Sequence, residues 1–265
     1  MRELAEIGNR LKEVFLYRDF LVNLTIIELK LRYRQSILGF LWTILNPLFY
    51  LSILALVFSR IIRFHVPAYT TFLFSGLVSW LMLQQTIIIG TASIVNNQHL
   101  IRKVYVPKMA FPLSNVLARY VDHLALVAIL IIYLSFFQFS FSPAFAFLPV
   151  SILIHFLFSF GAVLLLSVVY IKIRDIQQIA AIIFQALFYA SPVIYPAEAL
   201  PERVHFFLKL NPFYYFIQIF RYPIYSRQIP PLSDLATACA ITLITLAAGL
   251  WLFSSKEKEI VFHLS

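Results

Sequence analysis

The stretch ILGFLWTILNPLFYLSILALVFS, residues 37–59, decides the fold class of this chain. It runs for 23 residues without a charge, and about 20 residues in a helix rising 1.5 Å per residue cross a hydrocarbon layer of roughly 30 Å. Pro47, which follows Asn46 within the run, predicts a kink and a freed backbone carbonyl that a neighbouring helix or water must satisfy. The run is therefore predicted to be the first membrane-spanning helix.

The composition of the whole chain agrees with this prediction. Hydrophobic residues make up 61% and charged residues 12% of its 265 residues, and the mean hydropathy is +0.86. Soluble domains carry roughly 25% charged residues. We therefore expect an all-α integral membrane protein, with residues 1–265 forming a single transmembrane domain.

Further uncharged or nearly uncharged runs predict five more spans. The second lies within residues 66–95, and the others are predicted at about 111–136, 145–171, 176–194 and 235–255. Because the first long apolar run begins only at Ile37, no cleavable signal peptide is expected. Cys239 is the only cysteine, which excludes both a disulfide within the chain and a metal site built on several thiolates.

The segment before the first span, residues 1–36, has the pattern of a helix lying on the membrane surface. Apolar and polar side chains occupy opposite helical faces, the apolar ones being Phe20, Leu24, Ile27 and Leu31. Lys30, Arg32 and Arg34 place the end of this helix at the level of the lipid headgroups.

The connector between the second and third spans, NNQHLIRKVYVPKMAFP at residues 96–112, predicts a short helix. Its two asparagines can accept hydrogen bonds from the N–H groups of the first turn, and Pro107 ends the helix. Leu100, Ile101 and Val104 fall on one side at helical spacing. Such an apolar helix either fills a groove of another protein or lies in the headgroup layer.

Residues 195–231 contain apolar pieces that are too short to cross a bilayer as helices. Prolines at 196, 201, 212 and 223 bracket two of these pieces. We expect two short helices that lie at the membrane surface or dip partway into it.

The distribution of cations predicts the orientation of the chain. With six spans, 14 of the 21 Lys and Arg residues fall on the side that holds both termini and residues 96–112. Positively charged connectors remain in the cytosol, so both termini are predicted to be cytosolic. The net charge of +9 is explained by this orientation and by anionic lipid, rather than by nucleic acid.

The third predicted span contains Arg119, Asp122 and His123. Arg119 and Asp122 lie three residues apart and are predicted to pair across one helical turn. Because Arg119 lies near the cytosolic end, where its side chain can reach the headgroups, the pair is either a structural ion pair or part of a path or gate.

The motifs of several enzyme classes are absent from the sequence. It has no phosphate-binding G-x-x-x-x-G-K-[ST] loop and no His-Glu-x-x-His pair. We therefore expect no catalytic residues, no metal, no bound cofactor and no ATPase site in this chain. A membrane-embedded acyltransferase acting on glycans would need clustered His and carboxylate side chains at one membrane face, which the sequence does not offer.

Four motifs in order, RYRQSILGFLWTILNPLF (32–49), NNQHLIRKVYVPK (96–108), SPVIYP (191–196) and LNP (210–212), resemble the permease subunit of type-2 ABC polysaccharide exporters. Members of that family export O-antigen, capsule or teichoic acid chains across the bacterial inner membrane. The resemblance implies a homodimer with two cytosolic ATPase subunits that bind ATP and Mg²⁺, and a lipid-linked polysaccharide as substrate. A type-2 permease for a drug or another lipid is the alternative within the same family.

The resemblance also implies roles for individual residues. The coupling helix that contacts the ATPase would contain Asn97, Leu100, Ile101, Arg102, Lys103 and Tyr105. Arg32 and Arg34 would contact the phosphates of the lipid-linked glycan, since guanidinium groups match phosphate oxygens; anchoring to ordinary anionic lipid headgroups is the alternative.

In that family the first and fifth spans line the channel. Aromatic rings suit a sugar channel, because their faces accept the apolar C–H surface of a pyranose without fixing its register. The candidates for the channel lining are Trp42, Phe49, Tyr50, Phe184, Phe188, Tyr189 and Tyr195.

Overall fold

The computed structural model describes residues 2–58, 66–137 and 142–264, and within these ranges every regular element is helical. Four helices are long and apolar enough to cross a membrane. They are α4 (Tyr69–Gly90), α7 (Ala110–Phe137), α8 (Leu148–Lys172), which the short helix η2 (Pro143–Phe147) precedes, and α12 (Leu232–Leu264). The chain is thus a multi-pass membrane protein, as the composition predicts.

Two further apolar helices are shorter. Helix α3 (Leu41–Leu56) has 16 residues and continues through Pro47, and α9 (Ile176–Ala190) has 15 residues. At 1.5 Å per residue each is roughly 23 Å long, somewhat less than the hydrocarbon thickness of about 30 Å. The predicted end of the first span at residue 59 lies outside the described residues.

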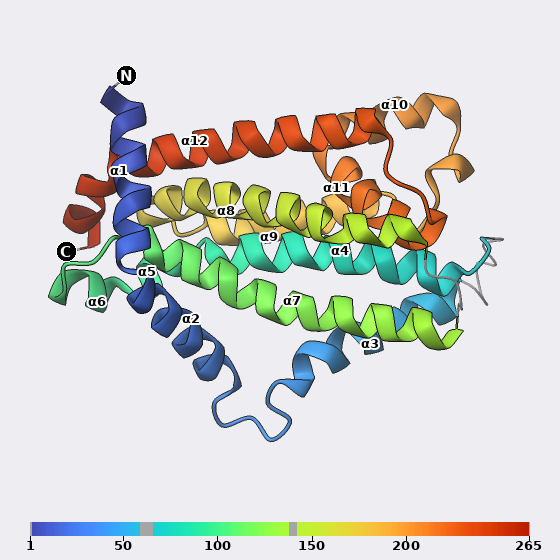
Figure 1. Cartoon of the computed structure of the whole chain (residues 1–265), viewed down its shortest axis with the longest axis horizontal. Coiled ribbons are helices and arrows are strands. Elements are labelled where there is room, and N and C mark those ends of the chain that lie inside the picture. Colours follow the sequence, from blue (N-terminus) through green and yellow to red (C-terminus); the bar gives the residue numbers. More distant parts are fainter. Residues whose placement is uncertain (1, 59–65, 138–141, 265) are drawn as a thin grey trace.

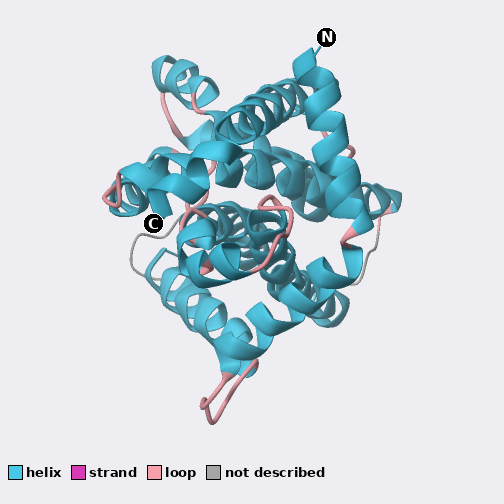
Figure 2. Cartoon of the chain, turned by 90° about the vertical axis from the view of Figure 1, so that its left-hand side faces the viewer, coloured by secondary structure: helices cyan, strands magenta, loops and turns pink. Residues whose placement is uncertain are grey.

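The long helices run side by side, and the two ends of the molecule differ (Figure 1). One end, which we call the terminal end, holds both chain termini, α1 (Arg2–Leu16), and the short helices α5 (Ser93–Asn96) and α6 (Gln98–Lys103). The opposite end holds α10 (Glu202–Leu210) and α11 (Pro212–Arg221). Figure 2 views the molecule from the terminal end, where α1 crosses the ends of the long helices.

Helix α4 is the central element, and most of its residues are buried. Polar side chains join it to its neighbours: the Ser79 hydroxyl lies 2.9 Å from His155 Nε2 on α8, and Thr86 Oγ1 lies 3.3 Å from His123 Nε2 on α7. Hydrogen bonds and small side chains hold helices together in lipid, where apolar burial between helices contributes little. These histidines therefore join spans in the interior of the bundle.

The segment before α3 forms two helices rather than one. Helix α1 ends at Leu16 and α2 (Arg18–Tyr33) follows after Tyr17, so the chain changes direction between them. Helix α2 packs on α7 through Phe20, whose ring meets that of Phe111 at a centroid distance of 6.0 Å. The apolar face predicted for residues 1–36 thus meets the protein in part, with Leu24 buried, while Ile27 and Leu31 are exposed.

Between α9 and α12 the chain forms the short helices η3 (Ala197–Ala199), α10, α11 and η4 (Tyr222–Ser226). Pro201 precedes α10 and Pro212 begins α11, which fits the positions at which proline is tolerated in helices. Asn211 caps α11 by accepting a hydrogen bond from the Phe213 N–H at 3.0 Å. Helix α11 packs on α4 and α12, and its Phe216, Ile217, Ile219 and Phe220 are fully buried.

Helices α8 and α12 pack closely at two glycines. A methyl group added to Gly161 would lie 2.6 Å from Leu246 Cα, and one added to Gly249 would lie 2.4 Å from the Gly161 carbonyl oxygen. Both neighbours are backbone atoms, which cannot rotate away. Glycine is therefore required at both positions for this contact.

We predict that Gly161→Val separates α8 from α12 and lowers the free energy of unfolding by about 1–3 kcal/mol, the usual cost of overpacking. Unfolding of the purified protein by SDS in mixed micelles measures this change. Gly8→Val on α1 is the matched control, because a Cβ at Gly8 meets nothing within 4 Å. Equal stabilities of the two variants would contradict the close helix contact.

Candidate functional site

A buried ion pair fixes the end of α2 to the middle of α7. The Arg32 guanidinium pairs with the Asp122 carboxylate, and the two side chains are 17% and 5% exposed. Sequence spacing predicts Arg119 as the partner of Asp122, and this prediction of the pairing is wrong: Asp122 points across to α2 instead of along its own helix. The physical reason is that α2 brings a second guanidinium to α7, a contact that spacing within one helix does not reveal.

Tyr33 extends this contact to α3. Its hydroxyl donates to Asp122 Oδ1 at 2.6 Å. The Tyr33 hydroxyl oxygen also lies 2.5 Å from the Thr43 hydroxyl oxygen. Because a phenol has one proton and that proton goes to the carboxylate, Thr43 is the donor in the second hydrogen bond. The four residues Arg32, Tyr33, Thr43 and Asp122, which we call the polar cluster, thus join three helices.

A pocket of about 370 Å³ opens beside the polar cluster. Its polar lining includes Asn46 of α3, Gln85 of α4 and Arg119 of α7, together with Arg32 and Asp122. The Arg119 Nε atom is buried and has no hydrogen-bond partner in the described structure. With two guanidinium groups and one carboxylate in its lining, the pocket has a net positive charge and suits an anionic group.

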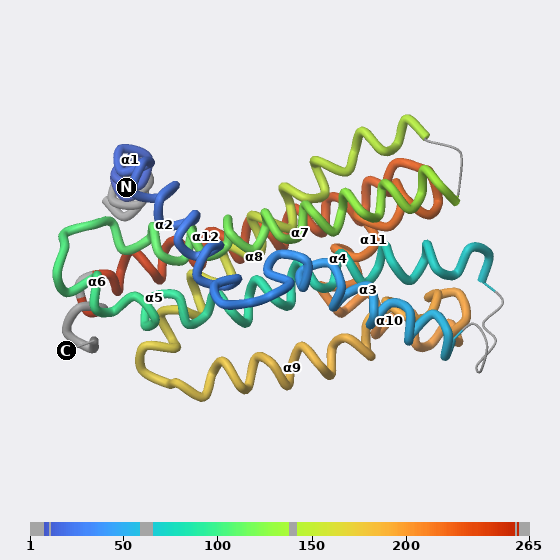
Figure 3. Tube along the Cα trace, turned by 90° about the horizontal axis from the view of Figure 1, so that it is seen from below, coloured from blue at the N-terminus to red at the C-terminus, as the bar shows by residue number. Residues whose placement is uncertain are grey.

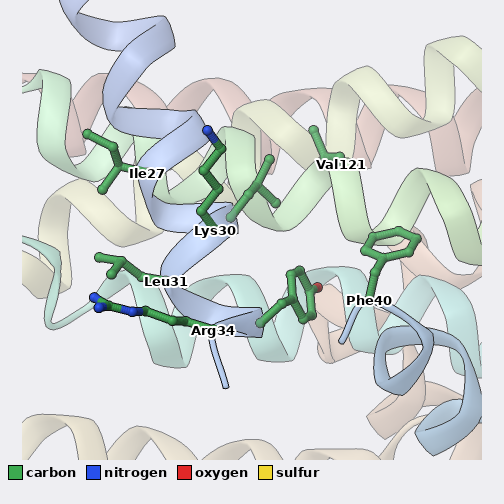
Figure 4. Close-up of a pocket in the computed structure, with 8 residues that line it drawn as sticks. Ile27, Lys30, Leu31, Arg34, Phe40 and Val121 are labelled. Carbon is green, nitrogen blue, oxygen red and sulfur yellow. The ribbon is translucent and has the colours of Figure 1, made fainter. Parts of the chain in front are cut away.

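A second, more apolar groove of about 730 Å³ lies between α2, α7 and the loop before α3. Figure 4 shows Ile27, Lys30, Leu31 and Arg34 along α2, with Phe40 and Val121 across the groove from them. Lys30 and Arg34 are both exposed, whereas Arg32 is engaged with Asp122. The groove therefore combines an apolar floor with two exposed cations, and this combination suits a lipid with an anionic headgroup.

The exposed surfaces of α3 and α9 carry polar groups that the exposed surfaces of α7 and α12 lack in their middle parts. Exposed residues in the middle of α7 and α12 are apolar, such as Leu124 and Ile132 on α7 and Leu243 and Ile244 on α12, as expected for contact with lipid. Exposed residues on α3 and α9 include side chains with hydrogen-bonding groups, namely Asn46, Tyr50, Gln185 and Tyr189. An unsatisfied amide in hydrocarbon is costly, so these two faces are suited to water, sugar or another protein chain.

Helices α3 and α9 both pack on α4, and Figure 3 shows α9 along one edge of the molecule. They meet near the opposite end, where the rings of Tyr50 and Phe188 lie 6.3 Å apart. The exposed faces of the two helices are therefore adjacent at this point.

The candidate channel aromatics divide according to exposure. Trp42, Phe49, Tyr50 and Tyr189 are 40–62% exposed on α3 and α9. Tyr195 is half-buried, and its hydroxyl donates to the Tyr189 carbonyl at 2.9 Å. Phe184 and Phe188 are buried, with centroids 5.8 and 5.6 Å from that of Trp80, so they support the exposed face of α9 from behind.

The predicted coupling segment forms a helix of only six residues, α6. Asn97 precedes it, but the side chain donates to the Ser93 carbonyl at 2.9 Å instead of accepting from the first turn of α6. Ile101 is buried against the protein's own core, and Leu100 is partly buried beside it. The side chains left exposed are Arg102, Lys103, Val104 and Tyr105, the last being 83% exposed.

Glu257 connects this segment to both ends of the chain. It is 5% exposed on α12, and its carboxylate lies 2.9 Å from Arg10 Nε on α1 and 3.9 Å from Lys108 Nζ after α6. A pocket of about 480 Å³ adjoins this contact and is lined by Arg102, Lys103 and Tyr105 as well as by Arg10 and Glu257. Sequence reasoning missed Glu257, because in a charged tail one acid has no distinguishing signal.

Most of the chain matches a known protein family. Residues 21–225 match the family described as ABC-2 type transporter. The chain belongs to this family. The match begins within α2 and ends within η4, so it includes the polar cluster, α6, and the helices α3 and α9.

Curated relatives are similar over most of this ABC-2 family member. It is 29% identical to an O-antigen export system permease protein of Myxococcus xanthus over 251 residues, which cover 94% of this chain and 96% of the relative. An O-antigen export system permease protein of Klebsiella pneumoniae is 28% identical over 73% of this chain and 75% of its own length. A polysialic acid transport protein of Escherichia coli is 26% identical over 88% of this chain and 92% of its own length.

We predict that Asp122→Ala lowers the free energy of unfolding by about 3–5 kcal/mol, because it leaves the Arg32 charge buried without its partner. SDS titration of the purified protein measures the change. Arg34→Ala, which removes an exposed guanidinium just after the end of α2, is expected to change stability by less than about 0.5 kcal/mol.

A double-mutant cycle assigns the effect to the pair itself. The loss of stability in Arg32→Met combined with Asp122→Ala should be clearly smaller than the sum of the two single losses, since both buried charges are then absent. Additive losses would show that Arg32 and Asp122 act independently and would contradict the ion pair.

Proposed function

We propose that this chain is the membrane subunit of an exporter that moves a lipid-linked polysaccharide from the cytosol across the bacterial inner membrane. ATP hydrolysis on a separate subunit, which holds ATP and Mg²⁺, drives the movement. The observation that carries the proposal is the pair of exposed faces on α3 and α9, whose amide and phenol groups suit a polar, sugar-lined path within a membrane protein. The export functions named for the polysaccharide permeases similar to this chain support it.

In this proposal α3 and α9 complete a set of six spans. Both helices are slightly shorter than the bilayer is thick, and a short span is accommodated by local thinning of the bilayer. The terminal end, which holds α1, α6 and the charged end of α12, is cytosolic by the distribution of its cations. The opposite end, with α10 and α11, then faces outward.

Two copies of the chain form the channel in this proposal. In one copy the polar faces of α3 and α9 are open, and a second copy related by two-fold symmetry would place the same faces opposite them. Trp42, Phe49, Tyr50 and Tyr189 then face the path directly. Phe188 packs against the rings of Tyr50 and Tyr189 and holds them in place, because aromatic contacts restrict their rotamers. Phe184 packs on Trp80 behind α9, and the Tyr195 hydroxyl donates to the Tyr189 carbonyl at the end of the same helix.

The substrate enters at the cytosolic side, beside α2. We propose that Arg34, with Lys30, contacts the phosphate of the glycan lipid in the groove of Figure 4, while the lipid chain lies on its apolar floor. Arg32, paired with Asp122, positions α2 and adds positive charge to the neighbouring pocket. Membrane phospholipids compete for the same groove, since their headgroups offer similar oxygens.

Helix α6 and the residues after it form the proposed contact with the ATPase. The inward anchoring of Leu100 and Ile101 makes the segment rigid, and Arg102, Lys103 and Tyr105 present an exposed surface to a partner. Closure of the ATPase would then push α6 as a rigid element, and α4 and α7, which flank it in the chain, would move with it.

We predict that the chain purified alone hydrolyses no ATP and that co-expression with its cognate ATPase yields a stable complex. Replacing Arg102 and Lys103 by Glu should lower the affinity of the two proteins at least about 10-fold, because two side chains of the exposed surface then repel the partner groups that they attracted before. Charge reversal of exposed Lys209 at the opposite end is the control. A complex unaffected by the first variant would exclude this surface as the ATPase contact.

We predict that Asn46→Leu and Gln185→Leu each lower the rate of polysaccharide export by between about 2-fold and 10-fold. This range corresponds to the loss of one hydrogen bond, worth about 0.5–1.5 kcal/mol, to a sugar hydroxyl in the path. Surface polysaccharide measured over time in a strain lacking the chromosomal copy gives the rate. Thr237→Leu, which alters a half-buried polar side chain on α12 outside the contact with Gly161, should leave the rate unchanged at equal protein level. Full export by both Leu variants would contradict a path along α3 and α9.

Deletion of the chain tests the class of substrate. Loss of surface polysaccharide, with lipid-linked glycan accumulating in the cytosol, is the expected result. Normal surface polysaccharide together with sensitivity to a drug would instead identify a permease for another compound.

A further inference from the structure

A buried cation lies at the end of the molecule opposite the termini. Arg221, the last residue of α11, is 3% exposed, although it is the single charged residue of that helix. Its Nη1 donates to the Pro192 carbonyl at 2.7 Å and its Nη2 donates to the Val193 carbonyl at 3.1 Å. No carboxylate of the described residues lies within ion-pair distance of it.

The surroundings of Arg221 are shaped to hold the guanidinium in one position. Its central carbon lies 3.8 Å from the centroid of the Phe72 ring, which is the distance of a cation–π contact. A methyl group on Gly76 would lie 2.1 Å from Arg221 Nη2, so only glycine leaves room for the side chain. The guanidinium is thus a fixed part of the wall formed by α4 and α11.

A pocket of about 300 Å³ opens against this wall. Phe72, Tyr222 and Tyr225 give it aromatic surface, and Glu198, Gln218 and Arg221 give it polar groups. Tyr225 is held in place, because its hydroxyl donates to the Pro67 carbonyl at 2.9 Å and its ring packs edge-on against Phe72 with centroids 5.3 Å apart. The pocket therefore has fixed walls of mixed character.

This chemistry indicates the kind of ligand. One guanidinium and one carboxylate leave the lining without net charge, so a neutral group is favoured over an anion. Aromatic faces accept C–H surface, while the guanidinium, carboxylate and amide exchange hydrogen bonds with hydroxyls. A volume at the low end of the range for ligand sites limits the occupant to something small.

We propose that this pocket, formed by α4, η3, α11 and η4, binds a single neutral sugar unit of the polysaccharide at the outer end of the path. The inference rests on the proposed function and adds a second, distinct point of contact for the glycan, far from α2. A sugar held there would contact both Glu198 on η3 and Tyr222 on η4, which are separated in sequence by α10 and α11. Binding would thereby hold the helices of this end in a defined arrangement during export.

The experiment measures whether passing glycan protects the pocket. Ser226 is exposed and lines the pocket, so Ser226→Cys is prepared in a Cys239→Ser background, which removes the single natural cysteine. Intact cells with a permeabilised outer membrane are labelled with a membrane-impermeant maleimide. Labelling is compared between a strain that synthesises the glycan and one that lacks its first glycosyltransferase.

The expected result is slower labelling of Ser226→Cys in the strain that makes glycan. The labelling rate should fall by a factor of one plus the ratio of the local sugar concentration to its dissociation constant, which is about 3-fold when that concentration is twice the dissociation constant. Ser233→Cys, an exposed serine on α12 outside the pocket, is the matched control and should label equally in both strains. Adding Tyr222→Ala and Gln218→Ala should restore fast labelling of Ser226→Cys.

The outcomes separate this inference from the proposed function. Polysaccharide export is measured in the same cells, so equal labelling in both strains during normal export overturns the sugar site alone. Slow labelling in both strains would identify a phospholipid headgroup as the occupant and would also overturn it. If glycan slows the labelling of Ser233→Cys as much as that of Ser226→Cys, surface glycan shields the protein in general, and the sugar site is also overturned.

Discussion

The ion pair between Arg32 and Asp122 is the interaction on which the arrangement of the terminal half depends. A carboxylate buried within a span is stable only with a partner, and the partner here comes from α2, outside the spans. The requirement therefore fixes a surface helix to the bundle at one point. Tyr33 and Thr43 extend that point to the start of α3, so the position of α3 follows from the same contact.

In the opposite half of the molecule a buried charge also needs partners, but these partners are not carboxylates. Among the residues that the structure describes, Arg221 forms no ion pair with a carboxylate, and it is instead held by two backbone carbonyls and the face of Phe72. Those carbonyls belong to Pro192 and Val193, where the chain leaves α9, so their hydrogen-bonding capacity is used by a side chain rather than by a further helical turn. One buried charge thus joins the end of α9 to α11 and α4.

Sequence reasoning predicted the elements better than their contacts. Long apolar runs located α4, α7, α8 and α12, because the length of such a run is set by the bilayer and not by neighbours. The rotation of each helix depends on what it packs against, and helices apolar on all sides carry no periodic signal of it. For this reason Ile101 and Phe184, both expected on functional surfaces, are buried, and Asp122 pairs with Arg32 rather than with Arg119. Arg221 did have a signal, as a lone cation within an otherwise uncharged helix between prolines.

The distribution of rigidity explains how a short helix can act on the whole bundle. Helix α6 has six residues and would be unstable alone, but Ile101 anchors it to the core and Lys108, just beyond it, lies near Glu257. Because Glu257 also binds Arg10, a displacement of this segment is shared by α1 and α12 as well as by α4 and α7. Packed helices respond to such a push as units rather than by local deformation, since their interiors are close-packed. In the proposed transport cycle, α3 and α9, which make fewer contacts with this set of helices, would change their separation as the rest of the bundle moves.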